Sequence, residues 1–192
     1  MRQRRFVVVI VVLMIMGLVP LAAAGADSAI LARVGVGIDP IDPGLAVGAG
    51  GGYRFSIPAG TMEILGEVYY SPYRETYTAG VNTFDYSEDL VIVSVRADWL
   101  FSYRFTEPGF YQVLGAGVFA GSFSWENYNR TTAYTEGNEY FASGAVLNLG
   151  LGWAFRRLVD ARLEAPILVF IGDYGEAIAV SIPITLGVIF RF

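Results

Sequence analysis

The chain has 192 residues with thirteen Arg, no Lys, no Cys and no His, and its formal net charge is −5. Without Cys there is no disulfide framework and no thiol chemistry, and without His the commonest general base and metal ligand is missing. The acidic balance argues against a nucleic-acid binder.

Residues 1–26 have the layout of a secretory signal peptide. A basic start is followed by the apolar run Phe6–Leu18, then by Pro20 and a series of small residues. This layout predicts cleavage after Ala24 or Ala26. An uncleaved inner-membrane anchor is the alternative, because the apolar stretch approaches spanning length if it continues to Ala24. After cleavage, ten Arg oppose eighteen acids, which gives a net charge of −8.

The remaining residues, 27–192, are enough for one domain and alternate between two faces in eight segments. The segments span approximately 29–38, 45–57, 61–73, 90–104, 109–125, 139–155, 159–172 and 177–192. Short turns at Pro58–Gly60, Thr106–Pro108 and Arg156–Leu158 alternate with longer loops at 39–44, 74–89, 126–138 and 173–176. This arrangement predicts an all-β fold, an antiparallel up-and-down transmembrane barrel of eight strands with both termini in the periplasm.

Charged strand residues share the face opposite the large apolar ones, although segment 109–125 has no clear phase. These inward residues are Arg33, Arg54, Glu63, Glu67, Arg96, Asp98, Arg104, Asp160, Arg162, Glu164 and Arg191. Buried charges pair, and an eight-stranded barrel is just wide enough for its own side chains. We therefore expect a lumen plugged by ion pairs. An active site or ion path made from the same residues is the alternative.

Aromatic residues gather at the strand ends beside the short turns. They are Tyr53, Phe55, Trp99, Phe101, Tyr103, Tyr111, Trp153, Phe155, Phe190 and Phe192. Rings in this position sit between lipid tails and head groups. We expect an interfacial girdle at the periplasmic rim.

The predicted long loops are acidic and contain several aromatic residues. Eleven acids, Asp39, Asp42, Glu75, Asp85, Glu88, Asp89, Glu126, Glu136, Glu139, Asp173 and Glu176, oppose Arg74 and Arg130, a balance of −9. Tyr77, Phe84, Tyr86, Tyr128 and Tyr134 lie among them. One interpretation is a hydrated, repulsive outer rim. The other is a surface that binds basic proteins or divalent cations, because Tyr supplies contact area at low entropy cost.

Motifs for catalysis or cofactor binding fail on context. Gly115–Gly121 faintly resembles a dinucleotide loop, but such a loop must open a helix, and a strand continues here. Asp39–Gly44 lacks the ligand number and closing Glu of a calcium loop. Barrel enzymes that cleave or acylate lipids resemble one another in using a His. We expect no enzyme activity and no catalytic, cofactor or metal site.

The last strand carries two further signals. Thr185, Gly187, Phe190 and Phe192 resemble the C-terminal insertion signal of bacterial outer-membrane barrels, which implies recognition by the barrel-assembly machinery and a place among outer-membrane lipids. The predicted hairpin also sets Pro166 opposite Pro183. Proline cannot donate to the ladder, so we expect a local bulge or a lateral gap in the wall there.

Over the whole mature region, the pattern resembles the small OmpA/OmpX class of eight-stranded barrels of the Gram-negative outer membrane. The resemblance implies a structural or surface-interaction role in the cell envelope. Two alternatives stay open. One is a narrow, porin-like channel for small or hydrophobic solutes, similar to the OmpW class. The other is a soluble ligand-binding barrel of lipocalin type, which would need its apolar face turned inward.

Overall fold

The computed structural model describes residues 28–38, 45–155, 158–171, 180–181 and 184–192. Its strands are β1 (Ser28–Ile38), β2 (Leu45–Ile57), β3 (Gly60–Ala79), β4 (Asn82–Phe101), β5 (Gly109–Asn129), β6 (Tyr134–Ala154), β7 (Val159–Ile171), β8 (Val180–Ser181) and β9 (Ile184–Arg191). The predicted signal peptide, the connections 39–44 and 173–176, and Arg156–Arg157 of one predicted turn lie outside the described residues. No helix among the described residues is long and apolar enough to cross a membrane.

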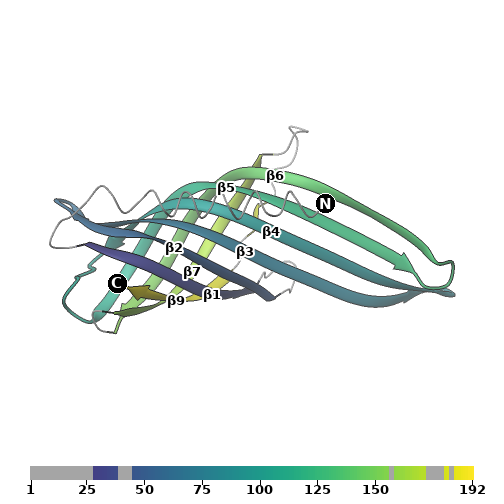
Figure 1. Ribbon diagram of the computed structural model, residues 1–192, viewed down its shortest axis with the longest axis horizontal. Helices are drawn as coiled ribbons and strands as arrows, with labels where there is room; N and C mark the ends of the chain where they lie inside the picture. Colours follow the sequence, from purple (N-terminus) through teal and green to yellow (C-terminus); the bar gives the residue numbers. More distant parts are fainter. Residues whose placement is uncertain (1–27, 39–44, 156–157, 172–179, 182–183) are drawn as a thin grey trace.

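The strands form one closed antiparallel ring (Figure 1). Each of β1 to β6 pairs with the next, β6 pairs with β7, and β7 pairs with β9, which returns to β1. The short β8 continues the register of β9 along β7, so the two share one place and the ring has eight positions. At the seam, the Phe192 N–H donates to the Ile30 carbonyl at 3.0 Å, and the Ile30 N–H donates back at 3.3 Å. The predicted barrel topology is confirmed.

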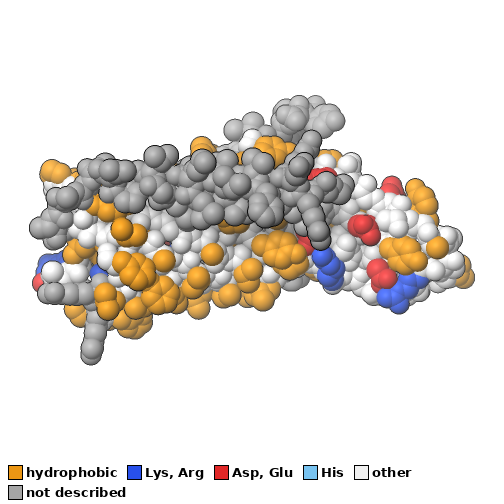
Figure 2. All heavy atoms as spheres, viewed as in Figure 1, with side chains coloured by type: hydrophobic (Ala, Val, Ile, Leu, Met, Phe, Trp, Pro, Cys, Tyr) orange, Lys and Arg blue, Asp and Glu red, His pale blue; other side chains and the backbone are white. Residues whose placement is uncertain are grey.

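The wall alternates between apolar side chains outside and buried side chains inside. Ile30, Val34 and Val36 are 49%, 52% and 48% exposed, whereas Arg33 between them is 3% exposed. Figure 2 shows apolar side chains spread over the visible outer wall of the barrel. The lipocalin alternative, with its apolar face inward, is therefore wrong.

The structure also settles the phase of β5. Tyr111, Val113 and Phe119 are buried, while Leu114 and Val118 on the other face are 51% and 64% exposed. The sequence alone does not show this alternation, because the small residues of the strand are compatible with either the lumenal or the lipid-facing side. Odd-numbered positions of β5 therefore point into the lumen.

The predicted loops at 74–89 and 126–138 are mostly strand. β3 and β4 continue to a turn at Gly80–Val81, and β5 and β6 continue to a turn at Arg130–Ala133. β2 pairs with β3 only as far as Tyr70, so the four strands run on beyond the rest of the ring. We call residues 71–79, 82–90, 123–129 and 134–140 the projecting sheet. Figure 1 shows it extending from the end of the barrel opposite the C-terminus.

The difference between the predicted loops and the observed strands has a physical cause. The charges along 74–89 and 126–138 are typical of surface connections, but Thr, Tyr and Phe alternate with them and favour strands. Gly80, with a φ of 64°, and Ala133, with a φ of 54°, provide the left-handed positions of the two turns. Tight turns replace the long loops.

The last hairpin has the predicted register. β7 pairs with β9 through Glu164 opposite Thr185, and with β8 through Leu168 opposite Ser181. Pro166 lies between these pairs and faces Asn148 of β6 on its other side. Because Pro183 lies outside the described residues, the bulge or lateral gap stays a prediction.

Candidate functional site

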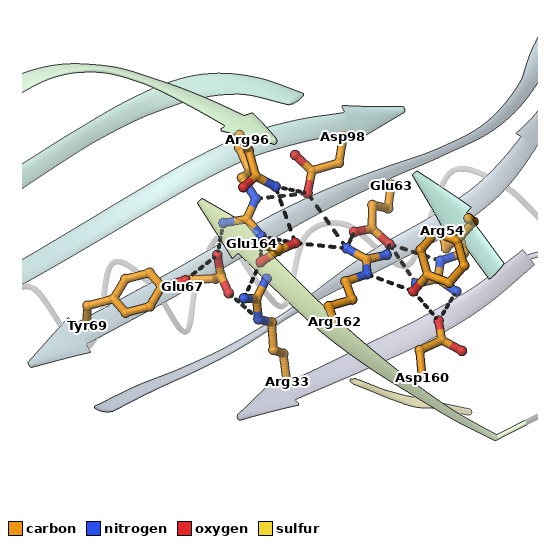
Figure 3. A network of polar contacts seen from close by, with 12 residues as sticks. Arg33, Arg54, Glu63, Glu67, Tyr69, Arg96, Asp98, Asp160, Arg162 and Glu164 are labelled. Atoms are coloured by element: carbon orange, nitrogen blue, oxygen red, sulfur yellow. Dashed lines mark hydrogen bonds and ion pairs between the residues drawn. The ribbon is translucent and has the colours of Figure 1, made fainter. Parts of the chain in front are cut away.

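The middle of the lumen is filled by charged side chains (Figure 3). Ten of the eleven predicted residues meet there, namely Arg33, Arg54, Arg96, Arg162, Arg191, Glu63, Glu67, Glu164, Asp98 and Asp160, and each is no more than 3% exposed. We call them the lumenal network. Five guanidinium groups face five carboxylates, so the formal charges balance, as buried charges require.

The half of the network nearer the projecting sheet joins two arginines to three carboxylates. Arg33 Nε lies 2.8 Å from Glu67 Oε1, and Arg33 Nη2 pairs with Glu164. Arg96 donates to Asp98 Oδ2 at 2.9 Å and to Glu164 Oε2 at 3.1 Å, and it also bonds Glu67. Glu67 and Glu164 therefore each bridge both arginines and tie four strands together.

The other half is built around Glu63. Arg54 donates from Nε and Nη2 to Glu63 Oε2 at 2.9 and 2.8 Å. Arg162 donates from Nη2 to the same oxygen at 2.7 Å, and from Nη1 to Oε1. Asp160 accepts from Arg54 Nη1 at 2.6 Å, and its other oxygen lies 3.1 Å from Arg191 Nη2. Such forked, charge-assisted contacts are the strong class of hydrogen bond.

Two neutral side chains, Tyr111 and Asn148, complete the network. The Tyr111 hydroxyl accepts from Arg162 Nε at 2.8 Å and donates to Asp160 Oδ2 at 3.1 Å. Asn148 is fully buried and donates to Asp98 and Glu164 at 3.2 and 3.3 Å. The inward phase of β6 pointed to Asn148, but Tyr111 could not be found while the phase of β5 was open.

Arg104 does not belong to the network, and this prediction is wrong. Its side chain is 68% exposed and pairs with Glu107 at 2.8 Å. Ser102 has a φ of 63°, which interrupts the alternation of β4 just after its end. Tyr103 consequently turns into the barrel, where it is 8% exposed and lies under the Arg54 guanidinium at 4.4 Å. Tyr103 and Tyr111 therefore face the lumen and are not part of the girdle.

Buried apolar clusters flank the lumenal network on both sides. Toward the projecting sheet, Ile92, Phe119, Val146 and Leu168 form one buried cluster. Toward the short turns, two further clusters meet at the partly buried Phe105. The members of these two clusters are Leu100, Tyr103, Tyr111, Val113 and Ala154 in one, and Ala29, Leu31, Leu65 and Ile189 in the other. The described side chains thus stack as apolar, ionic and apolar layers.

Glycines give the long charged side chains room to lie across the wall. Gly152 is opposite Arg162 in the ladder, and a Cβ at Gly152 would lie 2.2 Å from the Tyr111 ring. Gly115, opposite Asp98, would place a Cβ 1.8 Å from its carboxylate. Small residues on the inner face are therefore as much a part of the network as the charges.

We expect Gly152→Ala to lower the free energy of unfolding by about 1–3 kcal/mol, as overpacking does. The new methyl group would displace Tyr111, which bonds Arg162 at 2.8 Å. Gly66→Ala is the matched control, because the nearest atom to its Cβ would be 3.9 Å away. Chemical denaturation of the refolded barrels measures both. Equal losses at the two positions would contradict the steric argument.

No group of three or more metal-ligating side chains converges among the residues that the structure describes. The predicted acids of the outer end that fall within the described residues are instead spread over both faces of the projecting sheet. Glu75 and Glu88 lie on the face that continues the lumenal side, and Asp85 and Asp89 on the other.

Comparison with known proteins supports the architecture. No protein-family model and no curated protein matches the chain. Among solved structures, Neisserial surface protein A has a TM-score of 0.54 at 15% identity, over 86% of this chain and 96% of its own. The N-terminal β-barrel domain of Pseudomonas aeruginosa OprF gives 0.53 at 14%, over 85% and 97%. The attachment invasion locus protein Ail of Yersinia pestis gives 0.51 at 13%, over 86% and 98%.

All three are eight-stranded outer-membrane β-barrels. This chain has their fold. The agreement extends over almost the full length of each of the three structures, and at these identities it concerns the architecture alone.

Proposed function

We propose that the protein is an outer-membrane barrel with a closed lumen, whose task is to hold the projecting sheet outside the membrane for surface interactions. The observation that carries this proposal is the lumenal network. Glu63, Asp98, Asp160, Arg54 and Arg162 are each at most 1% exposed. Side chains that fill the ring in this way stabilise the barrel wall and do not line a solute path through the lumen.

The layering of the lumen favours this role over a channel. A water-filled path would have to cross the Ile92 and Phe119 layer, the balanced ion pairs, and the layer at Phe105. An eight-stranded ring leaves no room for a water-filled path, because its interior is just wide enough for its own side chains. The OmpW-like channel therefore has no supporting observation among the described residues.

The outer wall and the fold also support a location in the outer membrane. An outer wall of apolar side chains, a fold shared with outer-membrane barrels, and a predicted export signal together support the outer membrane. We expect the mature protein to fractionate with the outer membrane and to migrate as a folded species in SDS until it is boiled, since every strand of a closed barrel is paired. Recovery from the soluble periplasm without detergent would contradict the location.

Conductance tests the closed lumen. We expect the refolded protein in a planar bilayer to show no sustained current, because ion pairs and two apolar layers block the ring. Heat-modifiable migration of the same sample in SDS verifies that the barrel is folded. Steady ohmic steps from a folded sample would overturn the closed barrel and restore the channel alternative.

A further inference from the structure

The two faces of the projecting sheet differ in composition. Strand alternation and register place one set of side chains on the face that continues the lumenal side of the wall, which we call the aromatic face. Its rings include Tyr73, Tyr77, Phe84, Tyr86, Phe123 and Trp125. Tyr77 stacks on Phe84 at 5.1 Å, and Tyr73 meets Tyr86 edge-on at 6.1 Å. These side chains come from three neighbouring strands, β3, β4 and β5, and lie on one face.

Carboxylates alternate with the rings on this face. Glu88 stands directly between Tyr73 and Trp125 in the ladder, and Glu75 stands opposite Tyr86. Each acid accepts a hydroxyl hydrogen bond at 2.8 Å from the tyrosine two residues before it in its own strand. Neither acid forms an ion pair with a described residue. Among the described residues, the aromatic face therefore carries these two negative charges without an ion-pair partner.

On the opposite face, which we call the outer face, arginines pair with Asp85 and Asp89, whereas Glu126 and Glu139 have no ion pair with a described residue. Arg74 bonds Asp89 at 3.0 Å, and Arg130 bonds Asp85 with two contacts of 2.7 Å. The Arg130 guanidinium, with help from the Thr76 hydroxyl, holds the pKa of Asp85 below its usual range. Figure 2 shows basic and acidic side chains next to one another on the projecting end. Both arginines of the projection are thus engaged away from the aromatic face.

Aromatic rings and carboxylates in alternation suit one kind of ligand. A guanidinium or ammonium group is attracted to the face of a Tyr or Trp ring, and the same group can donate hydrogen bonds to a carboxylate beside that ring. Neighbouring strands lie about 4.8 Å apart, so a cation above Glu88 is within reach of the rings of Tyr73 and Trp125. The missing component of this face is a positive charge.

We propose that the aromatic face is a docking surface for an Arg- or Lys-rich polypeptide segment of a partner. This inference rests on the proposed role of the barrel as an anchor for the sheet, and it names the chemistry of the partner. Charge complementarity selects a cationic peptide over a neutral glycan, because a glycan leaves Glu75 and Glu88 without a counter-charge. The closed lumen beneath the face keeps the partner at the surface.

Binding of a fluorescently labelled oligo-arginine peptide to the full mature protein in nanodiscs tests the proposal by anisotropy. Glu75→Gln with Glu88→Gln should weaken the affinity about tenfold, the equivalent of about 1.4 kcal/mol. The matched control is Glu126→Gln with Glu139→Gln, which changes the net charge equally but on the outer face. This control should change the affinity less than twofold, by our estimate for exposed charges.

A second pair of variants tests the rings. Tyr86→Leu should weaken peptide binding severalfold, because it removes the ring beside Glu75, whereas Tyr128→Leu on the outer face should not. Equal losses in both carboxylate variants would mean undirected attraction and would overturn the proposal. Binding that survives every substitution would point to pairing along the edge strands of the projecting sheet and would also overturn it. The conductance of the barrel is unaffected by any of these outcomes, so it tests the anchor role separately.

Discussion

Replacing Arg162 by Met is expected to lower the free energy of unfolding by about 3–5 kcal/mol, the usual cost of leaving a buried charge without its partner. Arg162 makes two hydrogen bonds to Glu63 and one to the Tyr111 hydroxyl, and none of the three residues is more than 1% exposed. Its loss leaves Glu63 with Arg54 as its remaining cation. Denaturant unfolding followed by heat-modifiable migration measures the change.

Two further variants show whether the loss arises from the pair. Adding Glu63→Gln to Arg162→Met should recover part of the stability, because the uncompensated carboxylate is then neutral. Arg104→Met is the matched control, since Arg104 is an exposed arginine whose ion pair among the described residues is with Glu107. It should cost at most about 0.5 kcal/mol. Additive losses in the double variant would mean that these side chains are solvated, as in an open pore.

Deleting Phe192 is expected to remove most of the correctly assembled barrel from the outer membrane while changing the stability of the molecules that do fold much less. The Phe192 side chain is 77% exposed, so the folded wall loses little packing. The backbone of Phe192 nevertheless pairs with Ile30 at the seam. The C-terminal pattern of Thr185, Gly187, Phe190 and Phe192 is the predicted signal for the assembly machinery.

The measurement is the heat-modifiable fraction of outer-membrane protein in cells. Phe192→Ala separates the ring from the backbone, because it keeps the two seam hydrogen bonds and removes only the aromatic side chain. Tyr134→Ala, at a residue that is 64% exposed on the projecting sheet, is the control. A normal yield after deletion of Phe192 would contradict the assembly role of the C-terminus.

Much of this architecture follows from periodicity alone. Where one face of a strand is apolar and the other charged, as in β1, β4 and β7, the phase is unambiguous and the inward residues are correctly identified. The last hairpin has the predicted register for a similar reason, because the alternation along both of its strands is regular. The contacts within the lumenal network depend on rotamers and on neighbours across the ring, so the sequence predicted its members but not their partners.

The sequence predictions are wrong where a single backbone angle or a local sequence pattern overrides the regular alternation of the strands. The left-handed Ser102 reverses the alternation, which exchanges the sides of Tyr103 and Arg104. Nothing in the residue type of Ser announces this conformation, which Gly or Asn adopts more readily. The projecting sheet departs from the predicted loops because the Thr and Tyr alternation around Tyr77 and Tyr128 favours strands in spite of the acidic residues there.

The glycines of the inner wall have a consequence for how the strands find their partners. Sliding β4 along β5 by two residues would keep every side chain on its own face of the wall. The surface exposed to lipid would therefore be equally apolar in the correct and the slipped register. The slipped pairings would oppose Arg96 to Phe119 or Asp98 to Val113, in place of Gly117 and Gly115. Steric fit inside the ring thus favours the correct strand register over slipped registers that are equally favourable in hydrophobic burial. The packed interior therefore helps to select the correct strand pairing during assembly.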